Sequence, residues 1–420
     1  MLETWLWRAP RQVALCMLVS ALCVAPFAAC SDDSGPSPTD AGAADGQLDK
    51  DPGADGPATR DDSRPDAPAT RDGGSDAGPK LPTGLKANTW NVLYPGGDTI
   101  CSRGDKYMFA VNPGTVNKLV VDFEGGGACW TDASCSAAGA LFKERAEDSL
   151  KYIQQGYAEG IYDRKNPNNP FKDWYHVFVP YCTGDIHWGD AVKSYGSGAQ
   201  AFSINHKGAV NVRAVLDWIK KNFGGPEKIF VTGCSAGSYG SLLWTHHLIK
   251  QYPQAKVYQF GDSGAGVITS NFLSQSFPNW NALGAAPDWI PSLDPKQVDL
   301  LTKDVAYIYA ESAKNQPGHT FSQYNTLEDS VQVTYFQVMG GGTAQQWSQG
   351  MVSSIDTIMS DAPSFRAYLA EGKQHCIIPF KEFYTTQVKG KKLVDWLADM
   401  VDDQPVQSQR CTACVPTTGP

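Results

Sequence analysis

Basic clusters, long apolar runs and paired metal-ligand motifs are scarce in this sequence, and each absence excludes a class of protein. The 35 Lys and Arg residues are spread over 420 residues with a net charge of -9, so no basic patch predicts a nucleic-acid partner. After residue 30, no stretch reaches the ~18 apolar residues that a membrane helix needs. The Cys411-Thr-Ala-Cys414 motif lacks a second such motif or a pair of histidines, and we therefore expect no metal site.

The first thirty residues have the pattern of an export signal. Arg8 and Arg11 precede an apolar run from Val13 to Ala29, which ends in small residues directly before Cys30. This arrangement resembles a bacterial lipobox, in which Cys30 becomes the lipidated first residue of the mature protein. An ordinary signal peptide cut near Ala29, or an uncleaved anchor, is the alternative. We predict an extracytoplasmic protein, held at the cell envelope by a lipid anchor or secreted.

The next fifty residues consist almost entirely of Asp, Gly, Ala, Pro, Ser and Thr. The segment Pro57–Asp61 recurs as Pro68–Asp72, and its Asp-Gly pairs lack the ligand spacing of calcium loops. Such a composition cannot offset the entropy of ordering by burial of apolar groups. We predict a signal at residues 1–30, a disordered tether at 31–82 and one folded domain at 83–420.

From about Thr83, short apolar runs alternate with segments of helical periodicity. Buried strands are predicted at Leu119–Phe123, Val177–Val179, Ile229–Val231 and Val257–Phe260. Apolar residues recur at helical spacing between Val212 and Ile219, and again from Leu393 to Met400. This alternation predicts an α/β fold with a mostly parallel sheet and helices on both faces.

A G-x-S-x-G motif at Gly233–Gly237 carries the clearest chemical signal. It directly follows the predicted strand Lys228–Thr232 and precedes the helix-like segment Ser241–Leu248. Strand, tight turn and helix form the nucleophile elbow of α/β-hydrolases, which exposes the serine and directs the next backbone N–H toward an oxyanion. We predict Ser235 as a nucleophile and the amide of Ala236 as an oxyanion donor.

A glycine run, Glu124-Gly-Gly-Gly-Ala-Cys-Trp130, follows the predicted strand Leu119–Phe123. In esterases, a loop of this kind turns backbone N–H groups toward the developing oxyanion. No Lys-Ser/Thr pair follows the run, which excludes a phosphate-binding P-loop.

A serine nucleophile needs a histidine base and an acid that orients it. His375 is the histidine nearest the C-terminus, where the Ser…Asp…His order of this fold places the base. Asp262 and Asp329 both end plausible strands between the serine and the histidine. Spacing alone does not choose between them.

The chain resembles the pectin acetylesterase and Notum family of carboxylesterases. The resemblance rests on blocks found in one order along the folded part: Glu124–Trp130, Asn166–Pro170, Val179–Asp185, Gly233–Gly237, Asp262–Gly264, Glu328–Val331, His375–Ile378 and Gln387–Gly390. It implies an α/β-hydrolase fold for the domain at 83–420 and a catalytic triad of Ser235, Asp329 and His375. By the same match, Asp262 is a structural residue near the site.

The resemblance also implies which amides bind the oxyanion, and it has limits. The implied donors are those of Gly127, Ala128 and Ala236, with Gly126 as a further candidate. Family members commonly carry an aromatic residue at the place of Ala128 and a glycine at the place of Ser238. Residues 271–291, where a lid or pocket wall is expected, do not resemble the family.

Eight cysteines follow the predicted signal, and an even number in an exported chain favours disulfides. Spacing, strand order and the resemblance together predict the pairs Cys101–Cys182 and Cys129–Cys135. Cys411 and Cys414 are candidates for a short ring. Cys234 and Cys376 adjoin triad members and are expected to lie near each other, either bonded or with Cys234 as a buried thiol.

These observations predict ester hydrolysis through an acyl-enzyme, with no metal or organic cofactor. The expected substrate is an O-acetyl ester on a polysaccharide, and we expect a monomer that meets the membrane only through its lipid anchor. Removal of longer acyl groups from protein or lipid is the first alternative. A non-catalytic surface-binding protein and a serine peptidase on the same scaffold are further alternatives.

Overall fold

The computed structural model describes residues 81–156 and 158–414. The predicted signal peptide, Cys30 and nearly all of the predicted tether lie outside the described residues, so the division at 30 and 82 stays a prediction. Within the described ranges, no helix is both long enough and apolar enough to cross a membrane.

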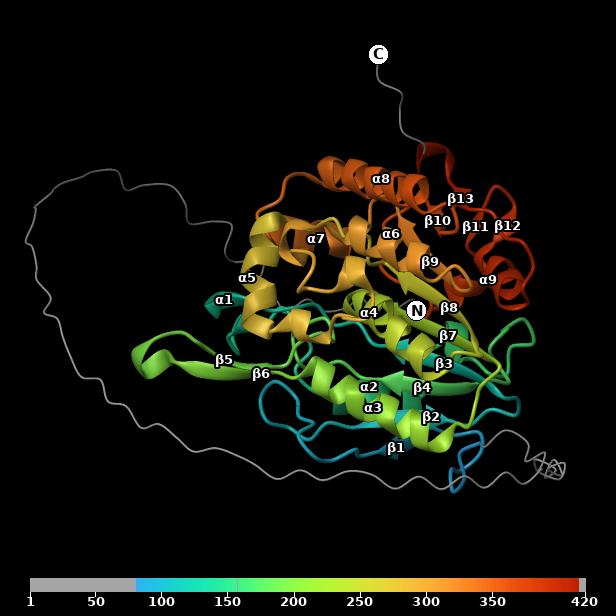
Figure 1. The fold of residues 1–420 in the computed structure, drawn as a ribbon, viewed down its shortest axis with the longest axis horizontal. Coiled ribbons are helices and arrows are strands. Elements are labelled where there is room, and N and C mark those ends of the chain that lie inside the picture. Colours follow the sequence, from blue (N-terminus) through green and yellow to red (C-terminus); the bar gives the residue numbers. More distant parts are fainter. Residues whose placement is uncertain (1–80, 157, 415–420) are drawn as a thin grey trace, which may run out of the picture. The chain divides into compact units, whose positions relative to one another are not determined.

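One nine-stranded sheet organises the fold, in the order β1-β2-β4-β3-β7-β8-β9-β10-β13 (Figure 1). The strands are β1 (Asn91–Leu93), β2 (Phe109–Asn112), β3 (Lys118–Phe123), β4 (Tyr175–Val179), β7 (Lys228–Cys234), β8 (Lys256–Asp262), β9 (Thr320–Thr326), β10 (Arg366–Ala370) and β13 (Gln409–Arg410). From β4 to β13 every neighbouring pair is parallel, and β1 and β2 add an antiparallel edge. The prediction of a mostly parallel sheet is confirmed.

Helices cover both faces of this sheet. They are α1 (Asp132–Cys135), α2 (Ala146–Gln154), α3 (Gly208–Asn222), α4 (Ala236–Gln251), α5 (Ser270–Trp280), α6 (Val305–Asn315), α7 (Ser330–Val338), α8 (Ala344–Asp361) and α9 (Leu393–Val401). Because side chains alternate along a strand, Leu119 and Val121 pack in the cluster that includes α3, α4, α6 and α8. Val120 packs in the cluster that includes α9, and α2 packs against β2 and β4. The predicted α/β-hydrolase-like architecture is confirmed.

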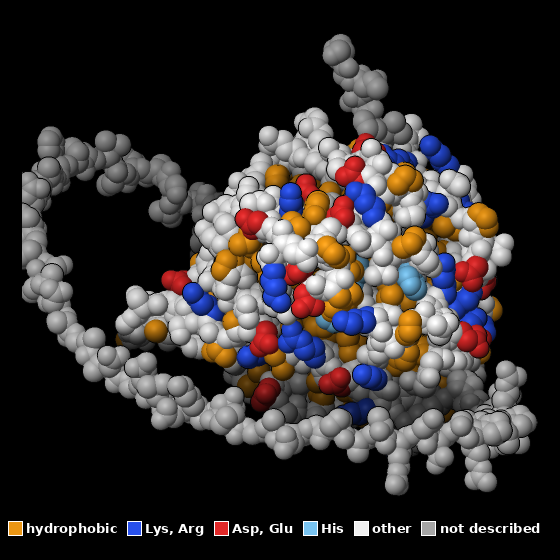
Figure 2. All heavy atoms as spheres, viewed as in Figure 1, with side chains coloured by type: hydrophobic (Ala, Val, Ile, Leu, Met, Phe, Trp, Pro, Cys, Tyr) orange, Lys and Arg blue, Asp and Glu red, His pale blue; other side chains and the backbone are white. Residues whose placement is uncertain are grey.

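A two-stranded hairpin, β5 (Ala191–Tyr195) and β6 (Phe202–His206), projects from the main body (Figure 1). A second small ribbon pairs β11 (Gln387–Val388) with β12 (Lys391–Lys392). Charged side chains of both signs are interspersed over the face shown in Figure 2, and neither sign gathers into a patch there.

Four disulfides cross-link the described chain. The structure joins Cys101 to Cys182 and Cys129 to Cys135, as the resemblance implied. It also joins Cys234 to Cys376 and Cys411 to Cys414, two bonds that the sequence left open. Four disulfides fit an oxidising, extracytoplasmic compartment.

The sheet also determines where the site lies. In the register, Phe123 of β3 lies beside Gly233 of β7, Gly233 beside Gly261 of β8, and Asp262 beside Tyr324 of β9. Parallel strands bring their carboxyl ends to one edge, where α/β folds bind ligands. The loops that follow β3, β7, β8, β9 and β10 therefore meet at this edge.

Candidate active site

Ser235 occupies a strained turn between β7 and α4. Its φ of 58° and ψ of -120° are rare for a residue with a side chain. A Cβ atom on Gly237 would lie 1.8 Å from the carbonyl oxygen of Phe123, so only glycine lets the turn approach the end of β3. This is the geometry of a nucleophile elbow, which holds the serine hydroxyl away from the sheet.

Three of the four expected oxyanion donors lie beside the serine. Gly127, Ala128 and Ala236 line one cavity together with Ser235. Ala236 is the first residue of α4, where a backbone N–H has no acceptor within the helix. Gly126 instead packs against the ring of Tyr181 and does not line this cavity.

Tyr335 of α7 also lines the cavity, and its hydroxyl lies beside Gly127 of the glycine loop. Its hydroxyl donates to the carbonyl oxygen of Leu141 and faces the amide of Ala128. Burial raises the pKa of Tyr335 to about 12, although the hydrogen bond from Ala128 acts in the opposite direction. The hydroxyl thus stays protonated at neutral pH.

Asp329 and His375 form a hydrogen-bonded pair. The imidazole Nδ1 lies 3.0 and 2.9 Å from the two carboxylate oxygens. Asp329 is fully buried at the N-cap of α7, where it accepts from the amides of Val331 (3.0 Å) and Gln332 (2.9 Å). These donors fix the carboxylate, which in turn orients the imidazole. Because His375 lines the same cavity as Ser235, the structure brings all three predicted triad members together.

Asp262, the competing acid, has a different environment. Its carboxylate accepts from the amides of Ile377 (2.7 Å) and Ile378 (2.9 Å), rather than from the imidazole. Burial raises the pKa of Asp262 to about 6, despite these hydrogen bonds. Asp262 therefore holds the chain that follows the histidine.

His187 supports the start of the glycine loop. Its Nε2 lies 2.8 Å from the carbonyl oxygen of Glu124, and burial lowers the pKa of His187 to about 4. The ring is therefore neutral at neutral pH and can donate from Nε2 to that carbonyl. The sequence carried no signal for this contact, because it joins loops after different strands.

A small apolar cavity of about 80 Å³ opens beside Ser235. Phe272 and Phe277 of α5 form one wall, so part of the segment without family resemblance lines the site. Met339 and Trp347, at the end of α7 and in α8, contribute to another wall. The sequence carried no signal for these residues, since only packing of distant helices brings them to the serine.

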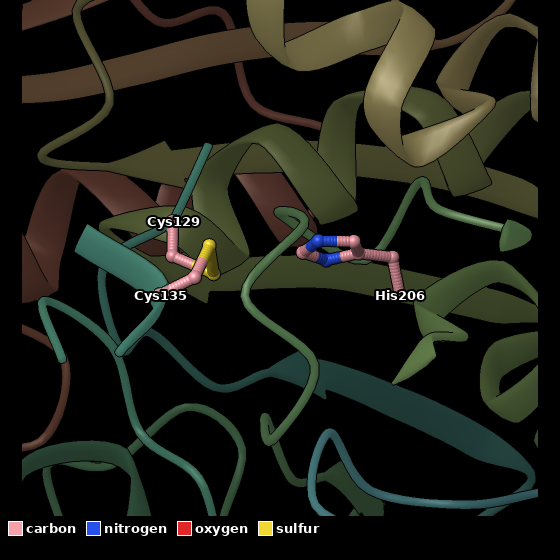
Figure 3. Close-up of side chains that lie close together, drawn as sticks. All are labelled: Cys129, Cys135 and His206. Carbon is pink, nitrogen blue, oxygen red and sulfur yellow. A yellow bond between two sulfur atoms is a disulfide. The ribbon is translucent and has the colours of Figure 1, made fainter. Parts of the chain in front are cut away.

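Two groups of cysteine and histidine side chains have the spacing of metal ligands in the described residues. Figure 3 shows the first, in which His206 faces the disulfide Cys129–Cys135. The nitrogens of His206 lie 2.9 Å from the Tyr195 hydroxyl and 2.9 Å from the Thr183 carbonyl oxygen. With the sulfurs bonded to each other and both nitrogens engaged, this group is structural. The second group, Cys234, His375 and Cys376, also contains a disulfide.

Residues 98–280 match the protein family described as pectinacetylesterase. Over 193 residues the chain is 29% identical to pectin acetylesterase 11 of Arabidopsis thaliana, covering 42% of this chain and 46% of the relative. Over 149 residues it is 32% identical to pectin acetylesterase 5 of the same plant, covering 34% and 33%. The predicted resemblance to this family is confirmed, and the match spans less than half the length of these relatives.

Two further similarities concern Notum proteins. The chain is 27% identical over 150 residues to the human palmitoleoyl-protein carboxylesterase NOTUM, covering 34% of this chain and 29% of the relative. The solved structure of the Wnt deacylase Notum from Drosophila matches with a TM-score of 0.55 and 17% identity, covering 77% of this chain and 97% of that one. At this identity the structural match shows the fold alone.

Proposed function

We propose that this chain is a serine esterase that removes short acyl groups from oxygen esters through a covalent acyl-enzyme. The observation that carries the proposal is that His375, hydrogen-bonded to the buried Asp329, lines the same cavity as the strained Ser235. Strain of this kind persists where the surrounding structure enforces it, as at catalytic nucleophiles.

In the proposed reaction, Ser235 attacks the ester carbonyl while His375 accepts the serine proton. Asp329 holds the imidazole in the tautomer with its proton on Nδ1 and stabilises the imidazolium that forms. The amides of Gly127, Ala128 and Ala236 bind the oxyanion, and each such donor contributes roughly 2.7–4 kcal/mol to transition-state stabilisation. His375 then returns the proton to the leaving alcohol and activates a water molecule, which releases the acid.

The size and lining of the cavity support a short acyl group. An engineered apolar cavity of roughly 150 Å³ holds one benzene molecule. A cavity of about 80 Å³ therefore favours an acyl group of a few carbons, and Phe272, Phe277 and Trp347 offer it an apolar wall. An O-acetyl ester on a polysaccharide fits this size and the names of the plant relatives. We further propose that the enzyme acts as a monomer at the cell envelope, anchored through Cys30.

A panel of p-nitrophenyl esters from acetate to palmitate tests the reaction and the acyl length. We expect the highest kcat/KM at acetate to butyrate, with a fall of at least tenfold at octanoate. Ser235→Ala is the control for background hydrolysis. A maximum at long chains would favour the longer-acyl alternative, which the human relative's name represents. Absence of hydrolysis and of fluorophosphonate labelling would favour a binding protein.

Release of acetate from acetylated pectin and acetylated xylan tests whether a polysaccharide carries the acyl group. We expect release from at least one of them by the wild type and none by Ser235→Ala. Hydrolysis of small acetyl esters without release from either polymer would contradict the polysaccharide proposal but not the esterase.

A further inference from the structure

The disulfide Cys234–Cys376 joins the residue before the nucleophile to the residue after the base. The two cysteines are 142 positions apart in the sequence, and their Cα atoms lie 5.6 Å apart. Cys234 is the last residue of β7, whereas Cys376 lies in the loop beyond β10. β8 and β9 lie between these two strands in the sheet, so the sheet itself does not connect Ser235 to His375 directly.

The bond also lies against the base itself. A ring nitrogen of His375 and the sulfur atoms of Cys234 and Cys376 lie within 4.8 Å of one another. The disulfide therefore forms part of the surface on which the imidazole packs. Removing the bond would therefore change the packing around the imidazole, while the hydrogen bonds to Asp329 would remain possible.

The backbone is strained on both sides of the disulfide, at Ser235 and at Cys376. Nine non-glycine residues of the described chain have positive φ, and three of them are Ser235 (58°), Ser263 (57°) and Cys376 (64°). Hydrogen bonds join these three segments: the backbone N–H of Ser235 donates to the carbonyl oxygen of Asp262 (2.8 Å), and the backbone N–H of Cys376 donates to the Ser263 hydroxyl (2.9 Å). Such conformations persist only when their surroundings enforce them.

We infer that Cys234 and Cys376 are positioning residues, whose disulfide holds the His375 imidazole at the distance from Ser235 that proton transfer requires. The inference rests on the proposed esterase function. Its consequence is that the enzyme becomes fully active only after oxidation, as in the extracytoplasmic compartment that the four disulfides fit.

The chemical step is an ordinary thiol–disulfide exchange. A dithiol such as dithiothreitol gives two electrons and two protons to the bond, leaving Cys234 and Cys376 as thiols and itself as a cyclic disulfide. Two separate thiols need more room than a bonded pair, because unbonded atoms keep a van der Waals separation. The strained loop at Cys376 can then relax, and His375 moves with it.

The test compares two variants of the full chain, each of which lacks one of the four disulfides. In Cys234→Ala/Cys376→Ala we expect kcat to fall on the order of 10²-fold with KM within about threefold, since a misplacement of about 1 Å costs roughly this much. Fluorophosphonate labelling of Ser235 should slow in parallel. The matched control is Cys101→Ala/Cys182→Ala, which also removes a long-range disulfide, of separation 81, and should keep kcat within about threefold.

Further measurements distinguish a displaced imidazole from a loss of stability and from a failure of the proposed function. Circular dichroism and urea unfolding confirm that both variants are folded at the assay temperature. Dithiothreitol should lower kcat by a larger factor in the Cys101→Ala/Cys182→Ala control than in the Cys234→Ala/Cys376→Ala variant, since both variants keep the reducible Cys129–Cys135 bond. By NMR, the His375 imidazole resonances should shift or broaden in Cys234→Ala/Cys376→Ala alone, a readout that does not depend on catalysis.

Three outcomes would overturn the inference: a kcat within threefold of wild type in Cys234→Ala/Cys376→Ala, an equal loss in the control variant, or unchanged His375 resonances. If the wild type hydrolyses no ester, the proposed function fails instead, and the NMR comparison still decides whether the bond positions the imidazole.

Discussion

Two aspartate–histidine pairs in the described part of this protein have similar nitrogen–oxygen distances and very different surroundings. His375 lies 2.9 Å from Asp329, and His176 lies 3.1 Å from Asp122. The side chain of His375 is 16% exposed, whereas that of His176 is 4% exposed. His375 of the first pair lines a cavity that is also lined by Ser235, and Asp329 lies buried behind it.

The second pair is sealed inside the fold. Asp122 of β3 and His176 of β4 lie on adjacent strands, and Tyr162 stacks on the imidazole and donates its hydroxyl to Asp122. Trp90 packs against the ring edge-on at 5.0 Å. The comparison teaches that a hydrogen-bonded acid and base are not a catalytic unit by themselves. His375 differs from His176 in lining a cavity beside Ser235, the proposed nucleophile.

The largest effect should come from removing Ser235, the proposed nucleophile beside His375. Ser235→Ala should lower kcat by on the order of 10⁶-fold, as loss of a triad serine does elsewhere, and abolish fluorophosphonate labelling. The fold should remain, because an elbow serine is not part of the core. Activity within tenfold of wild type would mean that Ser235 is not the nucleophile.

Matched substitutions of the two acids test the comparison directly. Asp329→Asn should lower kcat on the order of 10⁴-fold, because the amide no longer holds the productive imidazole tautomer. Asp122→Asn should leave kcat within about threefold and lower the free energy of unfolding by about 1–3 kcal/mol, since it weakens a buried hydrogen-bond network. Steady-state kinetics and urea unfolding on both variants give the answer. Equal losses of kcat would erase the distinction between the pairs.

Asp262→Asn should act chiefly on stability, with kcat lowered by at most about tenfold. Asn keeps an acceptor for the amides of Ile377 and Ile378 but no longer ionises. Because burial raises the pKa of Asp262 to about 6, the wild type loses stability from this group as pH rises from about 4 to 6. In urea unfolding at several pH values, the Asp262→Asn variant should lack this loss of stability between about pH 4 and 6. A loss of kcat as large as that of Asp329→Asn would make Asp262 the acid.

The smallest expected effect is on the pH dependence of stability, through the buried His176. Burial lowers the pKa of His176 below its ordinary value of 6.5, so the unfolded chain binds a proton that the native state excludes. His176 therefore contributes stability above pH 6.5 that is lost as pH falls through its folded pKa. His176→Gln should reduce the slope of unfolding free energy against pH by at most about 1.4 kcal/mol per pH unit. Ser235→Ala, which changes no titratable group, should keep the wild-type slope, and an unaltered slope in His176→Gln would contradict the burial argument.

The predictable part of the site was local in the sequence. Strand, glycine-flanked serine and helix are contiguous, so the elbow at Ser235 could be predicted from a single segment. The glycine run after β3 could be predicted for the same reason. The choice of Asp329 over Asp262 could not, because both follow strands that end at the same edge of the sheet. The structure supports the choice through the contacts of each carboxylate.

The sequence alone determined the strands, the elbow and the order of the candidate residues, because these follow from periodicity and from backbone conformations that few residues adopt. Only the tertiary structure decided which aspartate contacts His375, that Cys234 bonds to Cys376, and that Phe272, Met339 and Trp347 enclose a cavity beside Ser235. Each of these contacts joins segments far apart in the chain. Their geometry depends on how helices pack over the carboxyl edge of the sheet, and no local pattern encodes that packing.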